Sequence, residues 1–230
     1  NFLVKGEYAQ DLFTVGGGFQ SSAQDKTSAF GVYGSVNPMD GLTVNAEYGN
    51  RNLDTEDDDL DPISAILASA AYEVGAFNVK GTFLMQDAGF INMNDDDADQ
   101  DWRIIDAIRF TGGGLADNTA VAIDASYNLT DALKLEGYFD YLLSQKIGDQ
   151  KVEELKDNYA YKAGAVYTLD ALTLSGWYKA NGSQKSQFGG NATYKLVEGV
   201  ETSFEVTSTT DELKSKDAKL EYTAKVVATL

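Results

Sequence analysis

Two acidic runs carry the side chains best suited to metal binding. They read "DTEDDDLD" at residues 54–61 and "NDDDADQD" at residues 94–101. Carboxylate oxygens are the ligands that Ca²⁺ prefers, and alternate aspartates in the second run have the spacing that opens a hard-cation loop. The glycine and the distal glutamate that complete an EF-hand are absent. The candidate Ca²⁺ ligands are Asp57, Asp59, Asp61, Asp97, Asp99 and Asp101.

Two alternatives to a specific Ca²⁺ site stay open for these acidic runs. One is weak binding of several ions on a cell surface. The other is a solvated loop whose charge only keeps the surface soluble.

The residue inventory argues against catalysis and against nucleic-acid binding. The chain has no cysteine and no histidine, which removes thiolate nucleophiles, imidazole metal ligands and the usual general base. The run "NGSQ" at 181–184 is only superficially similar to a serine nucleophile motif. A formal net charge of −18 leaves too little Lys/Arg surface for phosphate contacts. We therefore expect a protein that is not an enzyme and binds no nucleic acid.

Charged side chains recur at every second position of several segments. In "YNLTDALKLEGYFDY" (127–141), Leu133, Leu135, Phe139 and Tyr141 would face one way, and the residues between them the other. A side-chain period of two is typical of a β-strand with one apolar and one charged face. We expect the charged faces to line a water-filled lumen with a mild preference for cations. The candidate pore-lining residues are Glu47, Lys80, Lys134, Glu136, Asp140 and Lys179.

The same hairpin pattern recurs along the chain, for example in "YGSVNPMDGLTVNAEY" (33–48) and "YTLDALTLSGWY" (167–178). Tight turns are expected near 40–41, 75, 130–131, 170 and 198–199, and longer polar connections at Arg51–Pro62, Asp87–Asn118, Gln145–Asn158, Asn181–Lys185 and Ser208–Asp217. Strands are expected over 2–9, 11–22, 28–38, 41–52, 63–74, 76–87, 118–129, 132–144, 159–169, 171–181, 186–196, 200–209 and 218–230.

Alternation of short and long connections is typical of an antiparallel transmembrane β-barrel. We predict an all-β, up-and-down transmembrane barrel over residues 1–230, or the C-terminal part of a larger barrel. Residues 62–75 have a short helix as the alternative, and Trp102–Gly114 fits no element. The chain opens on Asn1 without Met inside an expected strand, so we expect a longer protein.

The apolar strand faces are expected to contact the lipid bilayer. The expected interfacial aromatics are Tyr127, Tyr141, Tyr48, Tyr167, Trp177 and Tyr178, although strict alternation places Trp177 on the polar side. The final segment "LEYTAKVVATL" alternates apolar and polar residues. It resembles the terminal strand that the outer-membrane barrel-assembly machinery reads, although Leu230 stands where that family has Phe or Trp. A soluble β-sandwich is the alternative.

The segments "VYGSVNPMDGLTVNAEY", "YNLTDALKLEGYFDY" and "YTAKVVATL" resemble the C-terminal barrel of S-layer-homology-anchored outer-membrane porins, the SlpA-like and OmpM-like proteins. The resemblance implies an S-layer-associated location in the bacterial outer membrane at the cell surface. It also implies passive diffusion of ions and small solutes, assembly as a homotrimer, and an anchoring domain outside this chain. A closed, non-conducting S-layer barrel or an adhesin-type structural β-protein is the alternative.

Overall fold

The computed structural model describes residues 2–22, 27–55, 58–59, 62–88, 90, 116–148, 150–152, 155, 158–197, 200–211 and 215–228. Its elements are all strands: β1 (Phe2–Gln10), β2 (Phe13–Ser22), β3 (Thr27–Met39), β4 (Leu42–Thr55), β5 (Asp58–Asp59), β6 (Ile63–Val74), β7 (Phe77–Gln86), β8 (Asp117–Asn128), β9 (Leu133–Ile147), β10 (Gln150–Lys151), β11 (Tyr159–Leu169), β12 (Leu172–Asn181), β13 (Lys185–Val197), β14 (Val200–Asp211) and β15 (Ser215–Ala228). In these ranges, no helix is long and apolar enough to cross a membrane.

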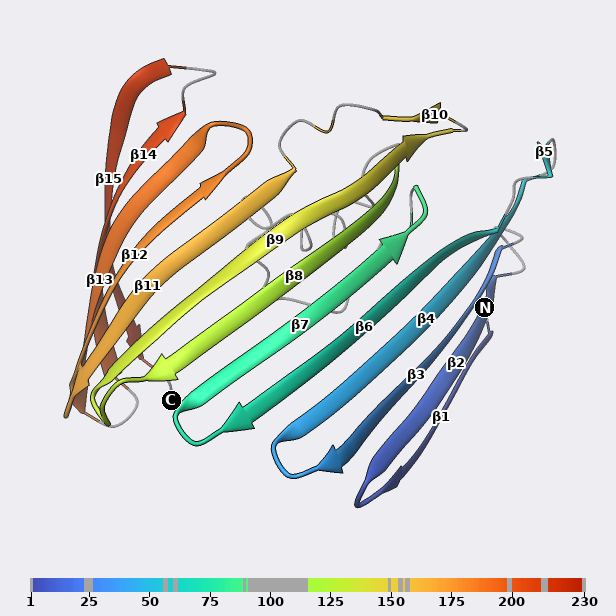
Figure 1. Cartoon of the computed structure of the whole chain (residues 1–230), viewed down its shortest axis with the longest axis horizontal. Coiled ribbons are helices and arrows are strands. Elements are labelled where there is room, and N and C mark those ends of the chain that lie inside the picture. The colour runs from blue at the N-terminus through green and yellow to red at the C-terminus, as the bar shows by residue number, and fades with distance from the viewer. Residues whose placement is uncertain are drawn as a thin grey trace. The chain divides into compact units, whose positions relative to one another are not determined.

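The strands follow one another across the sheet in sequence order, from β1 (blue) to β15 (red) in Figure 1. The two-residue strands β5 and β10 lie off this path and pair with β4 and β9. Each pairing whose register is known is antiparallel, for example Glu7 opposite Gly16 and Gly16 opposite Tyr33. The predicted all-β, antiparallel, up-and-down architecture is therefore confirmed, and Ile63–Val74 is a strand rather than a helix.

Tight turns join the strands at the positions that the sequence predicts. Gly41 (φ +77°) lies between β3 and β4, Gly75 (φ +59°) between β6 and β7, and Asp170 (φ +50°) between β11 and β12. Left-handed backbone favours glycine, and aspartate tolerates it, so these residues set the register of the three hairpins. A side chain at Gly41 would also collide with the carbonyl oxygen of Glu73 on β6.

One expected long connection is wrong. In the described part of Ser208–Asp217 the chain is strand, because β14 continues to Asp211 and β15 begins at Ser215. Threonine is β-branched and favours strands, so the polar run "TSTTD" extends the ladder rather than ending it. The unplaced segment Trp102–Gly114 lies outside the described residues.

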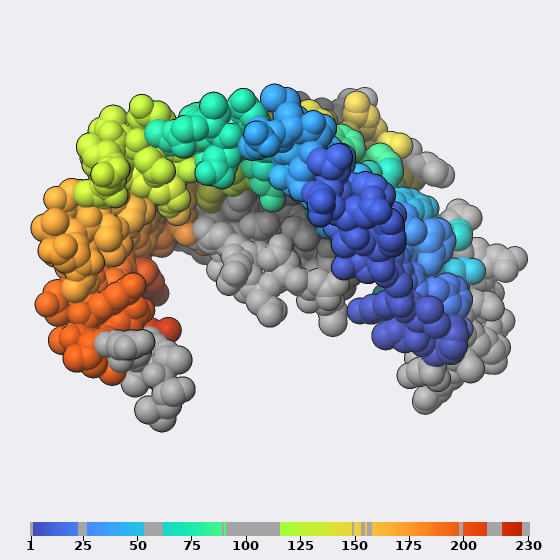
Figure 2. All heavy atoms as spheres, turned by 90° about the horizontal axis from the view of Figure 1, so that it is seen from below, coloured from blue at the N-terminus to red at the C-terminus, as the bar shows by residue number. Residues whose placement is uncertain are grey.

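The chain divides into two compact units. Unit 1 comprises Asn1–Val74, Lys80–Ile123 and Asp140–Leu155, and unit 2 comprises Gly75–Val79, Asp124–Phe139 and Lys156–Leu230. Within unit 1, strands β1 to β4 lie side by side as one layer, coloured in shades of blue in Figures 1 and 2. The units are described separately below.

Side chains alternate between two faces in both units, as the period-two pattern predicts. On β9, Phe139 and Leu143 are exposed, whereas Asp140 and Leu142 between them are buried. We call the side that carries Phe139 and Leu143 the apolar face and the opposite side the polar face. Directly opposed residues of neighbouring strands share a face. The pairings therefore extend both names over β1 to β6 in unit 1 and over β11 to β15 in unit 2. Contacts on the polar face join these strands to β7–β9, because Leu67 of β6 packs against the cluster of Leu84 and Leu142, and Lys162 of β11 contacts Glu136 of β9.

Candidate functional site

The apolar face is exposed instead of packed against protein. Phe19 is 43% exposed, Val32 50% and Ile123 53%, all on strands of unit 1. In unit 2, Phe204 is 52% exposed and Phe188 61%. Soluble proteins rarely expose contiguous apolar surface of this kind, and a large apolar side chain gains about 1.5–3 kcal/mol when it leaves water. This face therefore requires an apolar environment.

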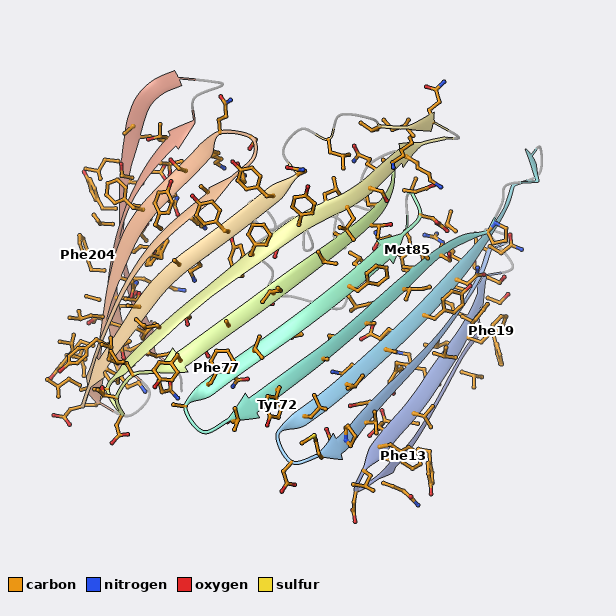
Figure 3. The ribbon with its side chains drawn as sticks, in the orientation of Figure 1. Phe13, Phe19, Tyr72, Phe77, Met85 and Phe204 are labelled. Atoms are coloured by element: carbon orange, nitrogen blue, oxygen red, sulfur yellow. The ribbon has the colours of Figure 1, made fainter. Side chains whose placement is uncertain are left out.

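Aromatic residues of the apolar face gather near the strand ends. In unit 1, Phe13 and Tyr72 lie near short turns, whereas Phe19 lies towards the opposite strand end, as does the apolar side chain of Met85 (Figure 3). In unit 2, Tyr127, Tyr167 and Tyr194 lie near short turns, and Tyr159, Tyr178 and Phe188 towards the opposite ends. Phe13 and Phe19 are separated by six residues, which is about 20 Å along a strand. Two aromatic belts of this kind flank the apolar band of membrane barrels, which is about 25 Å tall.

Several aromatic rings contact one another within these belts. Tyr8 and Phe13 have ring centroids 6.0 Å apart, and Phe30 and Tyr48 are 5.7 Å apart. In unit 2, Tyr161 lies 6.4 Å from Tyr159. These contacts hold the rings on the sheet surface, where amphipathic rings suit the boundary between lipid and water.

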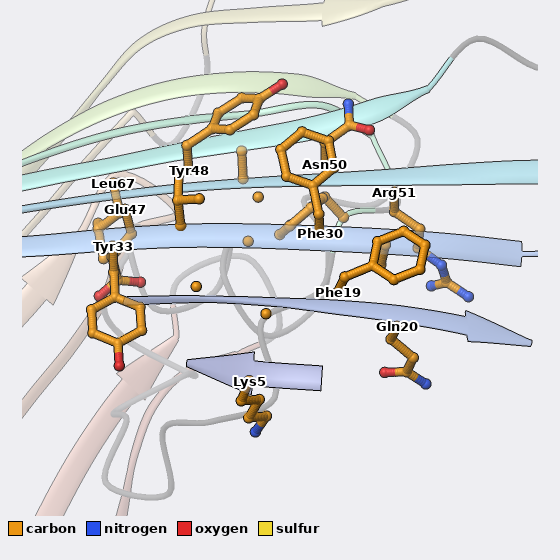
Figure 4. Close-up of a pocket in the computed structure, with 18 of the residues that line it drawn as sticks. Lys5, Phe19, Gln20, Phe30, Tyr33, Glu47, Tyr48, Asn50, Arg51 and Leu67 are labelled. Carbon is orange, nitrogen blue, oxygen red and sulfur yellow. The ribbon is translucent and has the colours of Figure 1, made fainter. Parts of the chain in front are cut away.

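The polar face of unit 1 carries a groove of ≈ 780 Å³ (Figure 4). It lies mainly over strands β1 to β4, and its lining reaches Leu67 of β6 and Leu84 and Gln86 of β7. Its floor is a row of cross-strand glycines, because Gly18 opposes Gly31 and Gly31 opposes Gly49. No side chain rises from this row. Space above Gly31 is open: a Cβ added there would meet no atom closer than 3.7 Å.

Two walls of polar side chains border the glycine row. One is the cross-strand row Glu7, Gly16, Tyr33 and Glu47, in which the Tyr33 hydroxyl donates a hydrogen bond to the Glu7 carboxylate. The other contains Gln20 and Arg51, which Figure 4 shows at the opposite end of the groove from Tyr33 and Glu47. Lys5 opposes Gly18 at the β1 side.

The Tyr33 ring lies flat against the sheet because the residue opposite it is Gly16. A Cβ at Gly16 would collide with the ring. Phe90 lies over Gly49 in the same way, where a Cβ would come within 2.6 Å of its ring. Covering a strand glycine with an aromatic ring protects its backbone from water and keeps the ring low on the surface. The Tyr33 ring therefore lies low at one wall of the groove, and the Phe90 ring covers the Gly49 end of its floor.

A different part of the polar face in unit 1 is covered. Leu84, Ala120, Ala122 and Leu142 form a buried cluster, and Leu155 from the connection after β10 packs against it. The Asn118 side chain donates a hydrogen bond to the Ala116 carbonyl (2.7 Å) and accepts one from Gln145 (3.0 Å). Buried amides need such partners. Around this cluster, which borders the groove at Leu84, the polar face of unit 1 is thus packed, whereas Lys80 on β7 is exposed.

Unit 2 carries a charged cluster on its polar face. The Glu136 carboxylate lies 3.2 Å from the Lys134 ammonium and 3.3 Å from that of Lys162. All three side chains are partly exposed, so each pair stabilises the fold by about 0.2–1 kcal/mol at most. Lys179 opposes Lys162 on the next strand and is half-buried. The cluster is solvated charge of mixed sign.

Trp177 of unit 2 belongs to the polar face. It opposes Gly189, where a Cβ would lie 2.6 Å from the indole, and its N–H donates to the Gln187 side chain at 3.5 Å. It therefore lies flat over a glycine, as Tyr33 does in unit 1.

The predicted lumen residues share the polar face, in two separate groups. Glu47, Lys80 and Asp140 belong to unit 1, and Lys134, Glu136 and Lys179 to unit 2. Glu47 and Lys80 are exposed, whereas the Asp140 side chain is 0% exposed. Of these residues, only Glu47 borders the groove.

Sequence reasoning missed Lys5, Glu7, Tyr33 and Arg51 as site residues. The available signal was the concentration of glycines in "VGGGFQ" and "FGVYG", which leaves neighbouring strands without side chains at several positions.

The predicted Ca²⁺ ligands cannot be placed. Asp57, Asp61, Asp97, Asp99 and Asp101 lie outside the described residues, and Asp59 is described only as part of the backbone of β5. Among the described residues, no three acidic side chains come close enough to hold a metal ion.

No protein-family model and no curated protein matches the sequence. The solved structures that are similar to it include two of a KdgM porin. A KdgM porin is 13% identical over 99% of both chains, with a TM-score of 0.40. A KdgM porin in complex with disordered oligogalacturonate is 12% identical over 100% of this chain and 99% of that chain, with a TM-score of 0.39.

Proposed function

We propose that this chain forms a β-barrel in the bacterial outer membrane and acts as a pore for the passive diffusion of small solutes and ions. The single observation that carries the proposal is the exposed apolar face with its two aromatic belts. An up-and-down antiparallel meander satisfies its backbone hydrogen bonds between neighbouring strands, which is the condition for crossing a membrane with strands. In such a barrel the polar face would line the lumen.

Mixed charge on the polar face supports an open, hydrated path rather than a dry interior. Glu47 and Lys80 are exposed in unit 1, as is much of the Lys134–Glu136–Lys162 cluster in unit 2. Burying such charges without water would be costly. No histidine or cysteine is available for catalysis, so the proposed role is that of a non-enzymatic channel.

The experiment that tests the proposal is conductance of the purified protein in planar lipid bilayers under a KCl gradient. Stepwise, steady current with a reversal potential that indicates cation preference supports the pore. Protein that inserts into the bilayer without conductance would exclude a pore. Protein that stays in solution without detergent would exclude the membrane location.

A closed structural barrel is the second candidate, and a specific observation favours it. The cluster of Leu84, Ala120, Ala122 and Leu142 covers part of the polar face, and Asp140 is fully buried beside it. A barrel filled in this way would insert into the membrane and conduct no ions. The same bilayer measurement separates this role from that of a pore.

Three finer predictions belong to the proposal as expectations from the sequence. They are attachment to an S-layer, assembly as a homotrimer, and Ca²⁺ binding at the acidic runs 54–61 and 94–101. Cross-linking in intact outer membranes followed by mass spectrometry tests the first two. Calcium titration by calorimetry tests the third.

A further inference from the structure

We propose that the groove over β1 to β4 binds small zwitterionic solutes of the amino-acid or dipeptide class. This inference rests on the proposed pore function, because it names the solutes for which the groove provides a binding site. The solute's ammonium would lie at Glu47 and its carboxylate at Arg51.

The charges of the groove balance, unlike those of the chain. Lys5 and Arg51 face Glu7 and Glu47 in a groove with no net charge, whereas the whole chain carries −18. A groove lined only by acids would attract cations of any kind. Equal and separated charges instead favour a solute that carries both signs, since each end then meets its opposite.

The two charges of the proposed pair are uncommitted. Within the described part of the chain, the Glu47 carboxylate and the Arg51 guanidinium have no hydrogen bond or ion pair. Glu7, in contrast, accepts the hydrogen bond of Tyr33. Glu47 and Arg51 are both exposed and are thus available to a solute.

The separation of these charges suits a short zwitterion. Glu47 and Arg51 share the polar face of β4 and are four residues apart, which is about 13 Å between their Cα atoms. Both side chains are long and flexible, so inclination towards each other shortens the gap between their charged groups. An extended dipeptide spans about 7 Å. Between the two residues on β4, the Phe90 ring lies over Gly49. The backbone of such a solute would therefore lie beside this ring, over Gly31 on β3, where the space is open.

Size and polarity also agree with a small solute. The groove measures ≈ 780 Å³, and pockets for small ligands are about 300–1,000 Å³. Gln20 adds an amide beside Arg51, and the Tyr33 ring adds a flat apolar surface beside Glu47. These groups can contact a peptide unit and its side chain.

The test compares two probes of similar size in the bilayer assay. Glycylglycine carries both charges, and N-acetylglycinamide carries neither. We expect glycylglycine to reduce the KCl conductance with saturation, and N-acetylglycinamide to produce no saturable effect. Because glycylglycine has no net charge, simple cation preference cannot produce this difference.

Variants assign the effect to the groove. In Glu47→Gln and Arg51→Gln, we expect the half-blocking concentration of glycylglycine to rise roughly two- to fivefold, as for the loss of one exposed ion pair. The matched controls are Glu201→Gln and Lys195→Gln, a cross-strand pair on β13 and β14 outside the groove. They should leave that concentration unchanged.

The inference is overturned if both probes have the same effect on conductance. It is also overturned if glycylglycine blocks the groove variants at the same concentration as the wild type. Absence of KCl conductance overturns the proposed pore instead. In that case, calorimetric titration of glycylglycine into the detergent-solubilised protein still tests the groove. Heat of binding that Glu47→Gln weakens and Glu201→Gln does not would support it, and equal heats would exclude it.

Discussion

Replacement of Ile123 by arginine distinguishes lipid from water at the apolar face. Ile123 is 53% exposed and lies on β8, four residues before Tyr127, which is near the turn to β9. Four residues correspond to about 13 Å along a strand, close to the middle of an apolar band about 25 Å tall. Arginine at the bilayer midplane of a barrel costs about 2–4 kcal/mol. The ratio of folded to unfolded protein should therefore fall roughly 30- to 1,000-fold.

The same substitution would be almost neutral if water covered this face, since surface changes usually stay within about 0.5 kcal/mol. The assay is reversible urea or guanidinium unfolding of protein folded into lipid vesicles, followed by tryptophan fluorescence. Leu196→Arg, beside the β13–β14 turn, controls for depth and should cost about 0–1 kcal/mol. Ser126→Arg controls for the face, because Ser126 faces the polar side of β8. An Ile123→Arg variant as stable as the wild type would refute lipid contact.

Three further predictions concern the charged cluster of unit 2, two strand glycines and the acidic runs. Glu136→Gln should shift the reversal potential in the direction of anion preference, because it leaves two lysine ammonium groups within 3.3 Å of a neutral side chain. An unchanged reversal potential would place this cluster outside the ion path. Gly137→Ala should reduce the free energy of unfolding by about 1–3 kcal/mol, because its Cβ would lie 2.5 Å from a backbone oxygen on β11. In the control variant Gly81→Ala, the new Cβ would meet no atom within 4 Å and should not destabilise the fold. Urea unfolding measures both variants. Replacement of Asp97, Asp99 and Asp101 by asparagine should abolish Ca²⁺ binding, as measured by calorimetry. Ca²⁺ binding that persists in this variant would exclude these aspartates as ligands.

The strand pattern could be predicted from the sequence because side-chain period and turn residues are local signals. The long strands lie where alternation places them, and Gly41 and Gly75 occupy the turns that join them. The error at Ser208–Asp217 has a local cause as well. Polarity alone predicts a loop there, whereas the β-branched threonines favour a strand.

The groove could not be predicted because it depends on register. Gly18, Gly31 and Gly49 are far apart in sequence, and only the pairing of β2, β3 and β4 brings them into one row. The buried state of Asp140 depends likewise on long-range packing, since alternation assigns its face but not what covers it. Alternation thus identifies candidate lumen residues, and packing decides which of them are accessible to solvent.

The two kinds of surface on the polar face of unit 1 determine how the main measurements must be combined. The packed cluster around Leu84 and Leu142 favours a closed barrel, whereas the glycine-floored groove with Glu47 and Arg51 favours a solvated path. Lipid contact at Ile123 is required by both roles and therefore cannot separate them. A conductance measurement can separate the two roles, because only a solvated path carries ions. If Ile123→Arg is destabilised and the wild type conducts ions, the packed cluster only narrows the lumen. If Ile123→Arg is destabilised and the wild type does not conduct, the packed cluster fills the interior of a structural barrel.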